Sequence, residues 1–353
     1  MYPRLTIDLE KFHHNGAQLC AMAARAGVHD LAFVTKSFCA LPEMIRCLED
    51  LPNRYLADSR VQNLRNYPET KKEKLLLRLP MLGEVDEVVR WVDVSLCSEG
   101  VTLAALDRAA EAQGKTHKVV LMVDMGDLRE GVFFRSTEEL LALARQAEAA
   151  EHLVLWGMAF NVTCYGSVIP TQQTLDDFRA LVALVEQDLG RTLDFVSAGN
   201  SSSIDLLEKG DFTGYNNLRL GESLLLGRET AYGHDLPGLW NDALVLEAEV
   251  IEARRKPTFP VGQRGMNAFG QVMEYEDRGE QLRLLAAVGQ QDMNWEDLIP
   301  LDEGIRIIGA SSDHLILESD LPGRQVGDVV RFRVQYGAAL RAFTSPYVEK
   351  VTL

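Results

Sequence analysis

The alternation of strand-like and helix-like segments through the first 200 residues constrains the fold of this chain most. Short apolar runs are followed by longer segments with apolar residues at helical spacing, the first of them Leu9 to Ala26. We predict strands at residues 5–8, 31–38, 54–58, 75–79, 92–97, 118–124, 153–160 and 193–197. This order predicts an α/β fold, a parallel (β/α)8 barrel of the TIM type. The alternative, a doubly wound open sheet, lacks a glycine fingerprint after the first strand.

The sequence changes character after Gly233. A Pro/Gly turn region is followed by alternating or β-rich segments, and helical periodicity nearly vanishes. These segments are 243–253, 282–288, 305–309, 315–318, 329–334 and 347–352. We therefore predict two domains, a barrel over residues 1–236 and an all-β domain over residues 237–353.

The charge balance excludes some classes of partner. The formal net charge is -16, and the sequence pI is about 4.9. A nucleic-acid binder needs a basic face, and docking to anionic lipid also needs positive charge. An acidic surface mildly suits a cationic small substrate. We predict a small-molecule substrate, with no nucleic-acid or membrane partner.

The location is predicted from the N-terminus and the cysteines. The first residues contain no apolar signal segment, and no window approaches the length of a membrane span. The five cysteines form no CxxC pair, and their number is odd. Reduced thiols in a cytoplasmic protein are the simplest explanation.

Within the stretch Leu31 to Phe38, the apolar, strand-like run ends on a lysine, Lys36. In a (β/α)8 barrel, residues at the carboxyl end of a strand face the active-site mouth. A lysine amine held there in apolar surroundings is a nucleophile that can form a Schiff base. The alternative is an edge lysine whose amine simply reaches solvent.

A second feature is the loop Gly199-Asn200-Ser201-Ser202-Ser203, which follows the last predicted strand. Barrels often bind phosphate near their last two loops, where backbone N–H groups and hydroxyls donate hydrogen bonds. The alternative is a polar turn in which Ser202 caps a helix, and the two interpretations are compatible. A reactive lysine and a phosphate site in one barrel mouth indicate pyridoxal 5′-phosphate (PLP).

At these positions the chain resembles the alanine racemase-like PLP enzymes of fold type III. The motifs occur in the family's order: Ile7-Asp8-Leu9 with Asn15, Val34-Thr35-Lys36, Asn200-Ser201 and Arg219-Leu220-Gly221. The strings VTKSFC, MVDMGDLREG, NVTCYGSVIP, GNSSS, LRLGESLLLGRETAYG and GASSDHLIL look closest to the ornithine racemase-like amino-acid racemases. The resemblance covers nearly the whole chain. It implies an amino-acid racemase, an isomerase that exchanges a proton at Cα.

The resemblance also implies site residues. Lys36 should carry PLP, and Arg219 should donate a hydrogen bond to the pyridine nitrogen. An arginine cannot give up its proton, so the ring nitrogen stays unprotonated and reprotonation at Cα is favoured over transamination. Arg129 matches an arginine near the family's active site, and a plain surface salt bridge is the alternative. The phosphate should be held by Asn200, Ser201, the backbone near Gly221 and Glu222, and Tyr336 in a predicted QYGAAL strand.

Racemisation needs an acid/base group on each face of Cα, and here the chain departs from the family. Lys36 should serve one face. Gln290 stands where alanine racemase has a tyrosine, and Asn161 stands where it has a histidine. Our candidates for the second group are His314, Asp313, Tyr165 and Cys164. We favour His314 because an imidazole both accepts and donates a proton near neutral pH. A capping or packing histidine is the alternative.

The resemblance suggests ornithine or lysine as substrate, and a distal ammonium needs an acidic partner. Asp292 and Asp313 are candidates, although both could be turn residues. The family's β-domain covers the barrel mouth of a second copy, so we predict a head-to-tail homodimer.

Three alternative functions stay open. A D-amino-acid dehydratase or aldolase would need a His/Cys metal pair, but position 316, two residues after His314, is Ile316. We therefore predict no metal site. A decarboxylase would need a cysteine–aspartate motif in its second domain, and we find none. A PLP carrier without turnover would resemble the barrel alone.

Overall fold

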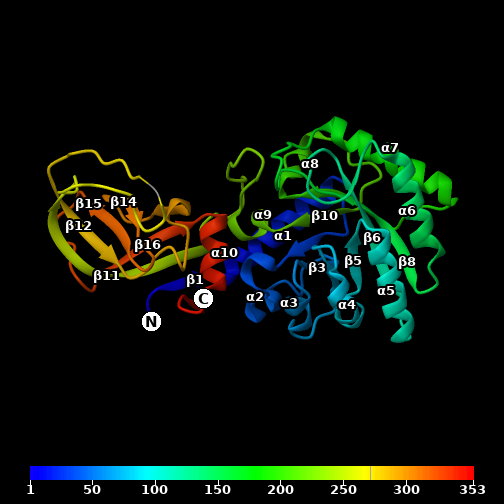
Figure 1. The fold of residues 1–353 in the computed structure, drawn as a ribbon, viewed down its shortest axis with the longest axis horizontal. Helices are drawn as coiled ribbons and strands as arrows, with labels where there is room; N and C mark the ends of the chain where they lie inside the picture. The colour runs from blue at the N-terminus through cyan, green and yellow to red at the C-terminus, as the bar shows by residue number, and fades with distance from the viewer. Residues whose placement is uncertain (271) are drawn as a thin grey trace. The chain divides into compact units, whose positions relative to one another are not determined.

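The computed structural model describes residues 1–270 and 272–353 (Figure 1). The chain divides into two compact units. We call Phe12–Trp240 the barrel unit, and Met1–Lys11 with Asn241–Leu353 the β unit. The domain limits predicted from the sequence, 1–236 and 237–353, stay a prediction.

Parallel strands of the barrel unit close into a ring, which confirms the predicted fold class. The order is β5-β4-β3-β2-β10-β9-β8-β6, and β6 pairs back to β5. A short strand, β7, pairs with β6 outside the ring. The strands are β2 (Ala32–Val34), β3 (Tyr55–Asp58), β4 (Glu73–Leu76), β5 (Val94–Cys97), β6 (His117–Asp124), β7 (Val132–Phe133), β8 (Leu153–Phe160), β9 (Phe195–Asn200) and β10 (Asn217–Leu220).

Helices follow most of these strands and lie around the ring (Figure 1). Those assigned wholly or mainly to this unit are α1 (Leu9–Arg25), η1 (Lys36–Phe38), α2 (Pro42–Cys47), α3 (Val61–Arg65), η2 (Leu82–Glu84), α4 (Val85–Trp91), α5 (Gly100–Ala112), α6 (Thr137–Ala149), α7 (Gln172–Leu189), η3 (Ser201–Ser203), α8 (Leu206–Lys209) and α9 (Glu222–Leu226). In α6 the buried residues are Leu140, Leu143, Ala144 and Ala147. This i, i+3, i+4, i+7 spacing gives one apolar stripe, which explains why the segment packs as a helix.

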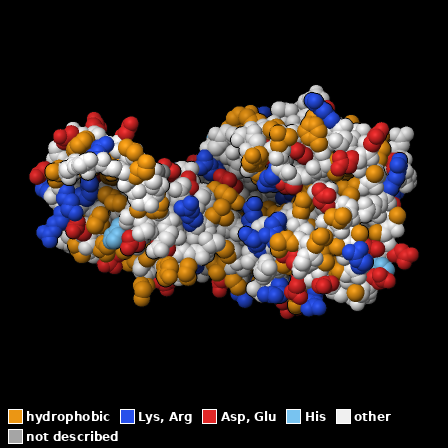
Figure 2. All heavy atoms as spheres, viewed as in Figure 1, with side chains coloured by type: hydrophobic (Ala, Val, Ile, Leu, Met, Phe, Trp, Pro, Cys, Tyr) orange, Lys and Arg blue, Asp and Glu red, His pale blue; other side chains and the backbone are white. Residues whose placement is uncertain are grey.

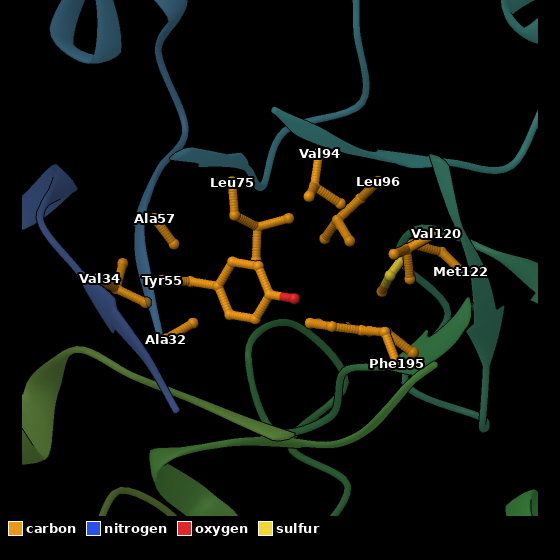
Figure 3. Close-up of a cluster of buried hydrophobic side chains, with 11 residues drawn as sticks. Ala32, Val34, Tyr55, Ala57, Leu75, Val94, Leu96, Val120, Met122 and Phe195 are labelled. Atoms are coloured by element: carbon orange, nitrogen blue, oxygen red, sulfur yellow. The ribbon is translucent and has the colours of Figure 1, made fainter. Parts of the chain in front are cut away.

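Side chains from the ring fill its interior. Successive residues of a strand point to opposite faces, so Val120 and Met122 of β6 enter the interior cluster while Leu121 faces outward, also buried. Figure 3 shows side chains of several strands gathered around the Tyr55 ring. The rings of Tyr55 and Phe195 meet edge to face, with centroids 5.5 Å apart. The barrel is therefore a packed core, and chemistry belongs to its strand ends.

Two strand assignments made from the sequence were wrong. The predicted first barrel strand, residues 5–8, is β1 (Arg4–Ile7) of the β unit, where it pairs with β11 and β17. The eighth barrel strand is β10, which pairs with β9 and β2. The serine-rich loop therefore follows the seventh strand of the ring, and the loop beginning at Asn161 follows the sixth.

The β unit holds the predicted all-β sheet, which is antiparallel except between β1 and β17. Its further elements are β11 (Leu244–Pro257), β12 (Glu280–Ala286), η4 (Trp295–Asp297), β13 (Leu298–Pro300), β14 (Ile305–Ala310), β15 (Leu315–Ser319), β16 (Val329–Val334), α10 (Tyr336–Thr344) and β17 (Glu349–Thr352). Helix α10 corrects the predicted QYGAAL strand. Its buried residues, Ala338, Ala339, Ala342 and Phe343, recur at helical spacing.

The molecular surface carries both signs of charge. On the face in Figure 2, lysines and arginines lie beside aspartates, glutamates and apolar side chains. None of the helices in the described residues is both long enough and apolar enough to cross a membrane.

His117 gives a prediction about acid stability. It lies at the start of β6 and is 2% exposed. Its Nε2 is 2.7 Å from the Oγ of Ser95. Burial lowers the pKa of His117 to about 4, and the charge of Lys115 adds to this. The unfolded chain takes up this proton near pH ~6.5, so the free energy of unfolding falls as pH drops from there toward about 4, by up to ~1.4 kcal/mol per pH unit.

We predict that His117→Gln flattens the pH dependence of stability between about pH 6.5 and 5. The measurement is urea unfolding across that range. His29→Gln changes an exposed histidine and is the control, which should keep the wild-type slope. Equal slopes for wild type and His117→Gln would show that His117 is not the titrating group.

Candidate active site

The segment around Lys36 is a turn rather than the end of a long strand. Strand β2 stops at Val34, and Lys36 begins the 3-10 helix η1. The Thr35 N–H donates to the Ala57 carbonyl at 2.8 Å, which ties the turn to β3. Lys36 is half-buried, and its amine has no hydrogen-bond or ion-pair partner within residues 1–270 and 272–353. An unengaged amine at a strand end is available for chemistry.

Ser201 lies at a point where several donors converge. Its hydroxyl oxygen is 3.3 Å from the backbone nitrogen of Gly221, 3.3 Å from that of Ser223 and 3.0 Å from the Ser223 hydroxyl. A Cβ at Gly221 would lie 3.0 Å from the Cβ of Val34, so any larger residue would crowd the end of β2. The N–H donors of Gly221 and Ser223 follow β10, and Lys36 follows β2. These two strands are neighbours in the barrel.

Asn200 has a structural role that the sequence did not reveal. Its side-chain oxygen accepts from the Ser202 N–H and hydroxyl, each at 2.8 Å. Its amide donates to the Asn161 side-chain oxygen at 2.7 Å and to the Val162 carbonyl at 3.0 Å. Asn200, rather than Ser202, therefore caps η3, and it joins the serine loop to the loop after β8.

Arg219 is buried in β10, with 4% of its surface exposed. Its guanidinium donates to the Ser197 hydroxyl and to the Phe160 carbonyl, each at 2.5 Å. Burial lowers the pKa of Arg219 to about 10, and the charge of Glu130 opposes this. The group stays protonated at neutral pH although its hydrogen-bond acceptors in the described residues are uncharged. A buried cation of this kind is a strong donor for an additional acceptor.

Arg129 forms an ion pair with Glu130, and both side chains are only partly exposed. The charge of Glu130 raises the pKa of Arg219, and the charge of Arg129 lowers it. This pair therefore lies near the buried guanidinium rather than on a distant surface. Glu130 lies in the motif MVDMGDLREG, which gives no local sign of this ion pair.

Asp127 is a second residue that sequence reasoning missed. Its carboxylate is 0% exposed and accepts backbone N–H groups from Thr163 at 2.9 Å, Tyr165 at 3.0 Å and Val168 at 3.3 Å. It therefore fixes the loop that carries Cys164, whose sulfur lies 3.4 Å from the Asn200 amide. The side chain of Tyr165 is exposed.

The remaining predicted residues belong to the β unit. His314 lies between β14 and β15, where its Nδ1 is 2.9 Å from the Asp313 carboxylate. The hydrogen bond from His314 lowers the pKa of Asp313. Gln290 donates from its side chain to the Ala310 carbonyl at 3.0 Å. Asp292 is buried and accepts from the Ser345 hydroxyl at 2.6 Å. Tyr336 is the first residue of α10.

The similarity to known proteins covers the whole chain. The chain is 43% identical to ornithine racemase of Acetoanaerobium sticklandii, over 100% of both proteins. It is 36% identical to lysine racemase of Thermotoga maritima, over 99% of this chain and 98% of that protein. Among solved structures, alanine racemase from Bartonella henselae with covalently bound pyridoxal phosphate has a similar fold, with a TM-score of 0.74, 17% identity and coverage of 99% of each chain.

The model of the family described as alanine racemase, N-terminal domain, matches residues 7–229. That span contains Lys36, the serine loop and Arg219. Together with the identity to the two racemases over nearly their whole length, this match shows that the chain belongs to the alanine racemase N-terminal domain family.

Proposed function

We propose that this protein is a PLP-dependent racemase that interconverts the L- and D-forms of a basic amino acid, ornithine or lysine. The observation that carries the proposal is the identity over the full chain to two racemases named for these substrates. The strand ends of the barrel unit add independent support, because they gather an unengaged lysine, a buried arginine and a group of hydrogen-bond donors.

The chain's own atoms fit PLP. The Lys36 amine suits the aldehyde, and the buried Arg219 guanidinium suits the pyridine nitrogen. The Ser201 hydroxyl with the N–H groups of Gly221 and Ser223 suits the phosphate, and the buried Ser203 hydroxyl of the same serine loop has no partner in the described residues. We assign Asn200 to holding the serine loop against the loop after β8, and the backbone near Glu222 and Tyr336 to the phosphate as the resemblance implies. Bound PLP would withdraw electrons from the substrate Cα and make its proton removable.

Lys36 is assigned to move a proton on one face of Cα. Its half-buried position at the mouth keeps the amine away from bulk water while leaving it accessible. Arg219 is assigned to hydrogen bonding alone, because a guanidinium with a pKa of about 10 keeps its proton at neutral pH.

We assign the other face of Cα to His314, supported by Asp313. The Asp313 carboxylate, 2.9 Å from one ring nitrogen, orients the imidazole. A second copy of the chain would supply this pair, in a head-to-tail homodimer in the cytoplasm. Sedimentation of an active monomer would contradict the dimer.

For the substrate's distal ammonium, we assign Asp313 rather than Asp292. Asp292 is 5% exposed and one of its carboxylate oxygens already accepts from Ser345, so little of it is open to a bound substrate. Asp313 keeps more than half of its side-chain surface exposed.

The first prediction tests the reaction. The protein with added PLP in D2O should convert one basic L-amino acid to a D-product that carries deuterium at Cα. Lys36→Ala should lower this conversion by at least ~100-fold, because it removes the proton-transfer group. Chiral chromatography with mass detection measures both quantities. Lys209→Ala changes an exposed lysine and is the control. Deuterated D-product formed by Lys36→Ala at the wild-type rate would overturn the assignment.

A second prediction tests the second face. His314→Ala should slow inversion by about 100-fold or more, while deuterium still enters the L-form through Lys36. Tyr165→Phe and Cys164→Ala, measured in parallel, should keep inversion. If Tyr165→Phe loses inversion and His314→Ala keeps it, the loop after β8 holds the second acid/base group instead.

A further inference from the structure

A buried group of three side chains lies directly behind the lysine-bearing turn. The Thr35 hydroxyl is 2.6 Å from an oxygen of the Asp58 carboxylate and 2.6 Å from the Tyr67 hydroxyl. Thr35 and Asp58 are 0% exposed, and Tyr67 is 8% exposed. Asp58 ends β3 and Tyr67 follows α3, so the group joins three parts of the barrel at the residue before Lys36.

The protons in this group have one consistent order when Asp58 is ionised. The other Asp58 oxygen accepts from the Arg60 N–H at 2.9 Å and from the Asn63 amide at 3.1 Å, and these bonds favour the carboxylate against burial, which raises the pKa of Asp58. No lysine or arginine forms an ion pair with Asp58 in the described part of the chain. A carboxylate can only accept, so Thr35 donates its single proton to Asp58 and Tyr67 donates to Thr35.

This group holds a turn that its own sequence does not favour. Cys39 and Ala40 follow η1 with φ of 51° and 53°, a left-handed conformation that non-glycine residues rarely adopt. Such a backbone persists only where surrounding contacts determine it. The bonds of Thr35 to Asp58 and Ala57 fix the start of the turn on β3.

We propose that Asp58 is a positioning residue for Lys36 and acts through Thr35 and Tyr67 without touching the substrate. The part of this proposal that concerns catalysis rests on the function proposed above. The part that concerns the order of the turn stands on the geometry alone.

The test compares Thr35→Val, which has the same shape without the hydroxyl, with Thr35→Ser, which keeps it. Asp58→Asn is the partner variant, because its single accepting oxygen cannot serve both Thr35 and the pair Arg60 and Asn63. Ser95→Ala is the matched control, since it removes a buried hydroxyl contact at the opposite end of the strands.

Two readouts are measured on each variant. The first is amide hydrogen exchange of residues 35–40 in the protein without cofactor. We expect about tenfold faster exchange in Thr35→Val and Asp58→Asn, with Thr35→Ser and Ser95→Ala within twofold of wild type. The second is the rate at which borohydride fixes PLP on Lys36. This rate should fall in the same variants whose exchange becomes faster, and kcat should fall more than KM changes.

The outcomes separate the two proposals. If wild-type Lys36 is never modified by PLP, the proposed function fails, and the exchange result still decides whether Asp58 orders the turn. Wild-type exchange in Thr35→Val would overturn the positioning role. Equal acceleration in Ser95→Ala would also overturn it, because the effect would then reflect general loss of stability.

Discussion

The buried guanidinium of Arg219 is the interaction on which the site depends most. It joins three neighbouring strands of the barrel, because it lies on β10 and donates to Ser197 of β9 and to the Phe160 carbonyl of β8. Burying a cation without an anionic hydrogen-bond partner costs free energy, and a purely structural contact would not need a charge. This cost has a reason if the N–H groups of Arg219 that are not used by Ser197 and Phe160 donate to a bound group. The same residue would then contribute to the packing of the barrel and to its chemistry.

The packed interior determines where the functional groups emerge. Tyr55 occupies the centre of the ring, and its hydroxyl accepts from the Trp156 ring nitrogen at 3.1 Å, so even the polar atom of this core is satisfied. The layer of side chains around it aligns the strands, and their carboxyl ends then place Lys36, Asp58 and Asn200 around one mouth. The rigid strands fix where each functional residue lies, and the short polar turns after them carry the side chains that bind and react.

The barrel could be predicted from the sequence, because long apolar strands such as 118–124 are local signals. The candidate site residues came from local motifs such as the serine loop, and their roles stay predictions. Sequence reasoning misassigned Leu5 to Ile7 and missed β10, because short strands resemble one another and their pairing is decided by partners far along the chain. The string QYGAAL around Tyr336 is short and apolar enough to fit a strand. The helical spacing becomes visible only when the buried alanines further along α10 are included. The contact between Thr35 and Tyr67 spans 32 residues and has no local pattern.

Gln290 has a structural role in the turn next to His314. Its side chain donates to the Ala310 carbonyl and its backbone N–H donates to the Ser311 carbonyl, so it now braces the turn before His314. Gly289 permits this packing, since a Cβ there would lie 2.3 Å from the Asp313 nitrogen. An amide cannot transfer protons at neutral pH, but it can hold the segment that carries an imidazole. Under the proposed function, Gln290 would therefore position the segment that carries His314 rather than transfer a proton itself.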